Sequence, residues 1–187
     1  MSAGRALTPK QVRLRREIER LVELNDLDPS KVGDLPPDWR TPSLQLKKDK
    51  LIRGGIVFSY VLMDEHLSDL ICWYFFGTRR SFPALWRTKR FRRFNHFVLD
   101  RLYLIQKLGL ADAARPIPRK FKGDLAALNE LRNGVAHSLF AVNRRQRPKW
   151  KGNSILSRVG FEQFMADMRE LDDFFYSRWP RRWRPRF

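Results

Sequence analysis

The feature that most constrains the fold is an apolar stretch, Gly54 to Phe76, which is long enough to cross a membrane but carries charge near its middle. Asp64, Glu65 and Asp69 lie in it, together with His66. Each acid at the centre of a membrane-spanning helix would cost roughly 2.5–3.5 kcal/mol. The stretch therefore predicts the buried central helix of a soluble bundle, with no membrane span.

Helical spacing of apolar residues continues through most of the chain, and prolines mark the breaks. Thr8-Pro9-Lys10-Gln11 has the composition of a capping box, which opens a first helix that runs to about Leu24. Further helices are predicted over about 46–76, 94–109, 119–139 and 161–179, with an extended Pro-rich linker at 28–43, a basic connector at 79–93, and a basic loop at 143–154 that leaves room for a short hairpin into Ile155-Leu156.

These patterns predict an all-α protein of one main domain. A bundle of four to five helices over 46–178 follows an N-terminal helical arm and linker at 1–45, and precedes an Arg/Trp-rich basic tail at 179–187. An apolar content of 43% over 187 residues is enough for a core. The single cysteine, Cys72, excludes a disulfide framework or a Cys-based zinc site. Since the N-terminus also lacks an apolar leader, we expect a cytoplasmic protein.

The charge of the chain is strongly positive. Lys and Arg number 38 against 20 Asp and Glu, which gives a formal net charge of +18. Such a chain attracts polyanions, and nucleic acid is the first candidate partner. The alternative is a strongly charged, solvated surface without a specific partner.

The segment Arg132-Asn133-Gly134-Val135-Ala136-His137 carries the chemistry that stands out most in this sequence. Asn133 and His137 are four residues apart, so they project from one face of a helix. Arg132 is adjacent, and Gly134 allows the backbone to deform locally. A cation, an amide and an imidazole so placed could hold a phosphodiester and move a proton. In the alternative interpretation, the Arg-Asn pair caps the helix end and His137 is a core residue with its hydrogen bonds satisfied.

Three segments together resemble the HEPN superfamily: residues 55–67, Trp73-Tyr74-Phe75-Phe76, and Leu131 to His137. The mark of that superfamily is an Arg, four to six residues, then a His, often with Asn directly after the Arg. Here four residues separate Arg132 from His137, and Asn133 is present. The resemblance covers roughly residues 46–178.

The resemblance implies a metal-independent endoribonuclease without a cofactor, in which two protomers bring their motifs together across a homodimer interface. Arg132 would contact the scissile phosphate, His137 would be the general acid or base, and Asn133 would orient them. Asp64 matches an acid that relatives often carry on the long helix, although it could simply pair with a buried Arg or Lys. RNA would be the substrate, and the biological role would be that of a toxin or defence effector with an antitoxin or regulatory protein as a further partner.

Two departures from that picture stay open. Some HEPN toxins carry a Tyr two residues beyond the His, which a partner modifies, whereas this chain has Leu139 there. Other HEPN domains lack nuclease activity and act as binding modules. The chain could therefore be a catalytically silent HEPN module that binds nucleic acid or a partner protein, or a basic structural protein whose motif is accidental.

Two tracts in which basic and aromatic residues alternate suit single-stranded RNA, because Arg binds phosphates and aromatic rings stack on bases. Candidate RNA-binding residues are Arg79, Arg80, Arg87, Lys89, Arg90, Arg92 and Arg93 in the connector, and Arg181, Arg182, Trp183 and Arg184 in the tail. In the alternative interpretations, Phe82, Trp86 and Phe91 belong to the core of a short helix, and the tail meets an anionic membrane or an acidic protein.

The two remaining histidines, His66 and His96, are expected at the surface or at an interface. Without cysteine partners, they do not predict a metal site.

Overall fold

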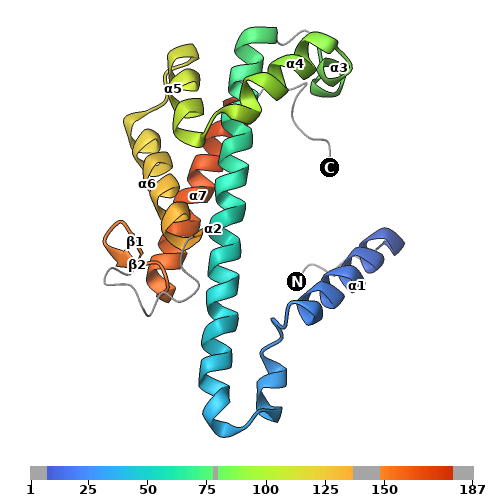
Figure 1. Cartoon of the computed structure of the whole chain (residues 1–187), viewed down its shortest axis with the longest axis vertical. Helices are drawn as coiled ribbons and strands as arrows, with labels where there is room; N and C mark the ends of the chain where they lie inside the picture. Colours follow the sequence, from blue (N-terminus) through green and yellow to red (C-terminus); the bar gives the residue numbers. More distant parts are fainter. Residues whose placement is uncertain (1–7, 78–79, 137–147, 179–187) are drawn as a thin grey trace, which may run out of the picture. The chain divides into compact units, whose positions relative to one another are not determined.

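The computed structural model describes residues 8–77, 80–136 and 148–178, and these residues are mostly helical (Figure 1). The all-α prediction is confirmed, with one very short hairpin as the exception. The elements are α1 (Pro9–Leu24), the 3₁₀ turn η1 (Ser30–Asp34), α2 (Pro37–Phe76), α3 (Phe82–Trp86), α4 (Lys89–Phe97), the 3₁₀ turn η2 (Leu99–Arg101), α5 (Leu104–Ala114), α6 (Arg119–Ala136), the antiparallel strands β1 (Lys149–Trp150) and β2 (Asn153–Ser154), and α7 (Arg158–Arg178).

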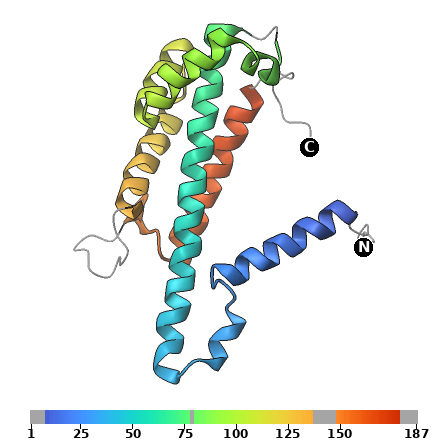
Figure 2. The same cartoon turned by 45° about the vertical axis from the view of Figure 1, so that its right-hand side comes forward.

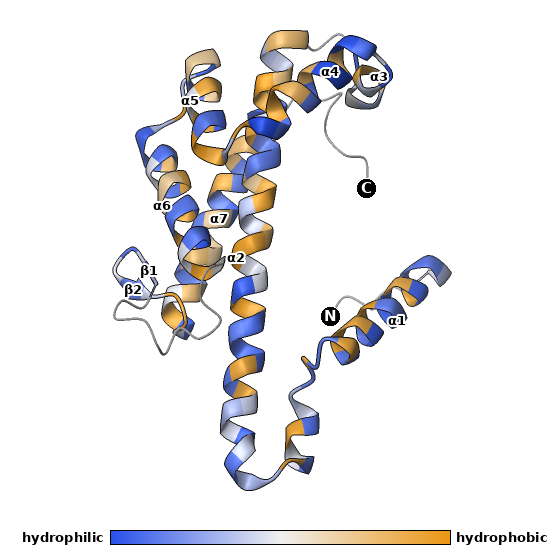
Figure 3. Cartoon of the chain, in the orientation of Figure 1, coloured by the Kyte–Doolittle hydropathy of each residue, from blue (hydrophilic) through white to orange (hydrophobic). Residues whose placement is uncertain are grey.

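The chain forms two compact units, and the boundary falls between Gly54 and Gly55, inside α2. In the first unit, α1 begins with the predicted capping box: the side chain of Thr8 accepts a hydrogen bond from the backbone of Gln11, and the Gln11 side chain accepts one from the backbone of Thr8. Hydrophobic and hydrophilic turns alternate along this helix (Figure 3). None of its residues is buried.

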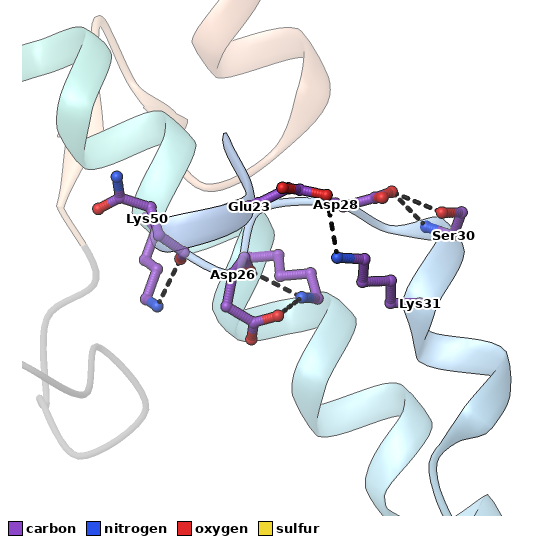
Figure 4. A network of polar contacts seen from close by, with 8 residues as sticks. Glu23, Asp26, Asp28, Ser30, Lys31 and Lys50 are labelled. Atoms are coloured by element: carbon purple, nitrogen blue, oxygen red, sulfur yellow. Dashed lines mark hydrogen bonds and ion pairs between the residues drawn. The ribbon is translucent and has the colours of Figure 1, made fainter. Parts of the chain in front are cut away.

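Polar contacts join the end of α1 to the first part of α2 (Figure 4). The buried Lys47 places its Nζ 2.6 Å from Oδ1 of Asp26 and also donates to the Asp26 backbone carbonyl. Lys50 donates to the Asn25 carbonyl at 3.3 Å. The hydrogen bond from Lys47 keeps the pKa of Asp26 below its usual range. These contacts close the turn that follows α1.

The predicted extended linker at 28–43 is wrong. A 3₁₀ turn forms within it, and α2 already begins at Pro37 and continues through Pro42. Pro37 occupies the first helical position, where a missing N–H costs nothing. Arg40 donates to the carbonyls of Leu35 and Gly33, at 2.9 and 3.0 Å, so backbone groups just before the helix keep partners.

The second unit is a helical bundle built on the C-terminal part of α2. Helix α7 runs beside α2 in both views (Figures 1 and 2), and its Phe161 comes so close that a Cβ on Gly55 would lie 2.9 Å from the ring. Helix α5 packs against α6, and the hairpin packs against α6 and α7. Buried apolar side chains from all four helices form the core: Ile56, Met63, Leu67, Ile71, Leu104, Leu108, Leu125, Leu128, Phe164, Leu171 and Phe175.

Helix α2 is not buried on every side, contrary to the prediction for its apolar stretch. Val57, Phe58 and Val61 are 44%, 69% and 52% exposed. Their spacing places them on one side of the helix, and the core residues of α2 lie on another. In the part of the chain that the structure describes, no helix combines the length and apolar character required to cross a membrane.

The single helix predicted over 94–109 is interrupted. Helix α4 ends at Phe97, and α5 begins only at Leu104, after η2. The interruption lets Leu99 and Leu104 both turn into the core, while Phe97 is 66% exposed. The side chain of Gln106 accepts a hydrogen bond from the backbone of Tyr103 at 2.9 Å, which gives α5 its own start.

Candidate functional site

The first two residues of the predicted motif lie in the last turn and a half of α6. The guanidinium of Arg132 sits over the ring of Tyr60 on α2, with its Cζ 5.1 Å from the ring centroid. Nη1 of Arg132 donates a hydrogen bond to Oδ1 of Asn133 at 3.0 Å. Asn133 is exposed, and Arg132 is half-buried. The stacked ring and the amide together orient a cation at the surface.

Asp64 lies one helical turn after Tyr60 on α2, so the two residues share a face. Its Oδ2 is 2.5 Å from Nζ of Lys107, a buried lysine of α5. This is the pairing with a buried basic residue that the sequence left as the alternative for Asp64. The carboxylate neutralises Lys107 inside the bundle and ties α5 to α2.

Arg132 itself makes no ion pair with a carboxylate among the described residues. Its positive charge is therefore not offset by an ion pair within the described residues, and its remaining N–H groups can donate. Planar, multidentate donors of this kind suit a phosphate.

His137 lies outside the described residues, as does Leu139. Gly134 is part of α6 with ordinary helical geometry, and a Cβ built on it would meet nothing within 4 Å. The backbone freedom that Gly134 allows is not used in the described part of α6, which continues as a regular helix to Ala136.

The basic connector folds into α3 and α4, which contact each other. Arg79 lies outside the described residues, whereas the other six candidate RNA-binding residues of this tract are all exposed: Arg80, Arg87, Lys89, Arg90, Arg92 and Arg93. Phe91 is fully buried, with its centroid 5.2 Å from that of Trp86. The core alternative is thus confirmed for Phe91, while Trp86 stays 42% exposed.

The tail residues named as RNA contacts, Arg181, Arg182, Trp183 and Arg184, also lie outside the described residues. The structure describes α7 up to Arg178, the last residue before the tail.

The expectation for His66 is wrong, because this residue is buried rather than at the surface. Its Nε2 lies 2.6 Å from Oδ1 of Asp172 on α7, and its ring stacks on Phe175. Burial lowers the pKa of His66, although Asp172 opposes that shift. The pair links α2 to α7 at the edge of the core, because the side chain of Asp172 is 43% exposed. His96 is exposed, as predicted.

A second polar cluster, which sequence reasoning missed, fastens the hairpin to the bundle. Nζ of Lys151 lies 2.9 Å from a carboxylate oxygen of both Asp124 on α6 and Asp167 on α7. The buried Trp150 donates from Nε1 to Asp167 at 2.7 Å. Burial disfavours the charge on Lys151, but the two carboxylates outweigh that effect and raise its pKa. These contacts give the hairpin a fixed place despite its two-residue strands.

Neither a reactive thiol nor a metal site is found among the residues that the structure describes. Cys72 is buried, and burial raises the pKa of its thiol to about 12. Within residues 8–77, 80–136 and 148–178, no group of three or more His, Cys, Asp or Glu side chains is placed to hold a metal ion.

Sequence reasoning found Arg132, Asn133 and Asp64 but missed Tyr60 and Lys107. The i,i+4 spacing of Tyr60 and Asp64 is visible in the sequence. It points to the site only when Arg132 of α6 is known to contact Tyr60 of α2. Lys107 carried no local signal, because it lies among the apolar residues of α5.

Comparison with known proteins adds no assignment: no protein-family model matches this chain, and neither does any curated protein or solved structure.

Proposed function

We propose that this chain is a metal-independent endoribonuclease of the HEPN type, with a HEPN-like bundle as its main domain. The observation that carries the proposal is the placement of Arg132: its guanidinium lies on Tyr60, bonds to Asn133, and has no carboxylate partner among the described residues. A cation so held is suited to a phosphate of a bound RNA.

The proposed reaction uses groups that the substrate and the motif supply. The 2′-hydroxyl of the RNA attacks the adjacent phosphorus, the 5′-oxygen leaves, and a 2′,3′-cyclic phosphate remains. His137 removes or delivers the proton, because an imidazole has its ordinary pKa near neutrality. Arg132 stabilises the charge that builds on the phosphate oxygens. Asp64 supports this face of α2 through its pair with Lys107 rather than transferring a proton.

The exposed apolar side of α2 supports a homodimer with a composite site. Val57, Tyr60, Val61 and Asp64 follow the i, i+3, i+4, i+7 spacing of one helix face. Val57 and Val61 of this face are 44% and 52% exposed, and burial of such side chains stabilises an interface. A second copy docked there would bring its own Arg132 close to that of the first.

The test is cleavage of a defined single-stranded RNA by the pure protein in excess EDTA. We expect cleavage to persist, to leave cyclic phosphate ends, and to spare DNA of the same sequence because DNA lacks the 2′-hydroxyl. His137→Ala should remove activity, while Arg169→Gln, an exposed change elsewhere on α7, should keep it. Cleavage that needs added magnesium, or that survives in His137→Ala, would contradict the mechanism.

The dimer is tested separately by sedimentation at micromolar concentration. We expect a species of about twice the chain mass of 22.3 kDa. Val61→Ser should shift it toward monomer, because it removes the most exposed apolar side chain of this face, which is 52% exposed. A strict monomer that still cleaves RNA would refute the composite site.

A second candidate function is a catalytically silent HEPN module that binds nucleic acid or a regulatory partner. The exposed basic residues of α4 favour it, since they would hold a polyanion whether or not the chain cleaves it. RNA binding without cleavage by the wild-type protein would select this function. A role as a toxin or defence effector depends on cleavage of cellular RNA, with or without an antitoxin that restrains it.

A further inference from the structure

A cavity of about 440 Å³ opens near the end of α2, away from the motif. Its lining comes from α2 and from the end of α5: Leu70, Trp73, Tyr74, Ala114 and Arg115. The volume falls within the range of small-molecule sites, roughly 300–1,000 Å³. Leu70 is buried and Tyr74 is 64% exposed, so the cavity has an apolar floor and an open aromatic rim.

One arginine, Arg115, lines this cavity, and a second, Arg178, contacts the residue that follows it. The guanidinium of Arg115 lies 5.0 Å from the ring centroid of Trp73. Arg178, at the end of α7, lies 4.1 Å from the ring centroid of Phe174 and donates from Nη1 to the carbonyl of Pro116 at 3.1 Å. This hydrogen bond places Arg178 beside the residue that follows Arg115.

The two charges are close enough to affect each other. Partial burial lowers the pKa of Arg178, and the positive charge of Arg115 lowers it further. Neither guanidinium forms an ion pair with a carboxylate among the described residues. A pair of like charges next to a cavity is relieved by an anion, and guanidinium groups donate to phosphate in a multidentate way.

The aromatic lining narrows the choice of anion. Trp73 and Tyr74 are adjacent on α2 and both line the cavity, where a flat, apolar ring could stack against them. Phosphate and flat ring occur together in a nucleotide. We propose that this cavity binds one nucleotide, with its phosphate on Arg115 and Arg178 and its base against Trp73 and Tyr74.

The site is separate from the motif. Trp73 follows Tyr60 by thirteen residues on α2, which is about 20 Å along a helix at 1.5 Å per residue. The inference therefore does not depend on RNA cleavage. A free mononucleotide and one nucleotide unit of a single-stranded RNA offer the same chemistry, and the two sources differ only in what extends beyond the cavity.

Calorimetric titration of the full chain at fixed, moderate salt tests the site with four ligands: adenosine monophosphate, adenosine, inorganic phosphate and a short single-stranded oligoadenylate. The monophosphate should bind at least tenfold more tightly than adenosine or inorganic phosphate, because only it uses both halves of the site. Tighter binding of the oligonucleotide than of the monophosphate identifies RNA as the source, whereas equal binding identifies the free nucleotide. Inorganic phosphate that binds as well as the monophosphate would overturn the proposal.

Variants then place the ligand in the cavity. Arg115→Gln and Arg178→Gln should each weaken binding of the monophosphate by about tenfold or more, since each removes a charged donor. Trp73→Leu should weaken it by roughly fivefold or more through lost stacking, and Trp73→Phe should retain most of the affinity. Arg169→Gln removes one exposed charge from the same helix as Arg178 and should change nothing.

Arg115 is exposed and has extended backbone geometry, so its replacement by Gln should leave the fold intact, as circular dichroism can check. Unchanged affinity for the monophosphate in both arginine variants would overturn the assignment of this cavity. Equal losses in Arg115→Gln and in the Arg169→Gln control would do the same, since they would show an effect of net charge alone.

Discussion

Helix α2 carries two arrangements of the same chemistry, and their difference is instructive. In the motif, the guanidinium carbon of Arg132 lies 5.1 Å from the ring centroid of Tyr60. Beside the cavity, the guanidinium carbon of Arg115 lies 5.0 Å from the ring centroid of Trp73. Arg132 takes its further partner from the next residue in the chain, Asn133. Arg115 instead borders a cavity, and its neighbouring cation comes from α7.

The acids near the two aromatic rings differ as well. Asp64, one turn after Tyr60, is neutralised by Lys107. Asp69, one turn before Trp73, forms no ion pair with a basic residue among those that the structure describes. Burial, with a smaller effect of Glu65, raises the pKa of Asp69 to about 7. Near Tyr60, the acid Asp64 is thus paired with a lysine, and the Arg132 guanidinium has no carboxylate partner among the described residues. Near Trp73, the acid Asp69 has a raised pKa, which favours its protonated form.

The largest expected effect is the loss of RNA cleavage on removal of Arg132, the arginine of the motif. Arg132→Ala should lower the rate of RNA cleavage by roughly 10²–10³-fold, the usual cost of losing one donor to a developing oxyanion. The melting temperature should change little, because the contacts of the Arg132 guanidinium within the described part of the chain are a ring and an exposed amide. Single-turnover cleavage and circular dichroism measure the two quantities, with Arg169→Gln as the matched control. Loss of fold together with activity would favour the interpretation of Arg132 as a capping residue.

The next effect tests the contrast between the acids. A carboxyl whose pKa is raised from 3.8 to about 7 contributes its full stability only below about pH 4, and that stability is lost as the pH rises through 7. Asp69→Asn should therefore raise the free energy of unfolding at pH 8 by on the order of 1–3 kcal/mol and leave it nearly unchanged at pH 4. Urea unfolding at the two pH values provides the measurement. An equal effect at both pH values would show that the pKa of Asp69 is not raised in the folded protein.

A smaller effect concerns the ring beneath Arg132. Tyr60→Leu should reduce cleavage by roughly two- to fivefold, since a cation–π contact at a partly exposed position is worth about 0.5–1 kcal/mol. Tyr60→Phe keeps the ring face and should retain most of the activity. If Tyr60→Phe lowers the cleavage rate as much as Tyr60→Leu does, the hydroxyl of Tyr60 rather than its ring would be the important group.

Local signals in the sequence predicted most helices and the motif, because a helix start or an i,i+4 spacing depends on neighbouring residues. The capping box at Thr8 and the helix that carries Arg132 are of this kind. The break between α4 and α5 was missed, because only the packed core shows that Leu99 and Leu104 must both turn inward.

The motif was predictable from the sequence, whereas the cavity was not. Arg132 and Asn133 are adjacent in the chain, so a short string revealed them. The cavity joins Trp73 and Arg115, which are 42 residues apart, with Arg178 a further 63 along. No spacing rule connects such positions, since their contact depends on how α5 and α7 pack against α2. The burial of Lys107 and of His66 was not predicted for the same reason.

The smallest expected effect compares two glycines in the bundle. Gly134 stands two residues after Arg132 in a regular helix with open space around it, whereas a Cβ on Gly55 would lie 2.9 Å from the ring of Phe161. Gly134→Ala should stabilise the protein by about 0.5–1 kcal/mol, because alanine loses less conformational freedom in a helix. Gly55→Ala should stabilise it less or destabilise it, since the Phe161 ring must move. Thermal unfolding of both variants measures the difference, and a destabilised Gly134→Ala variant would show that this position of α6 needs the backbone freedom of glycine.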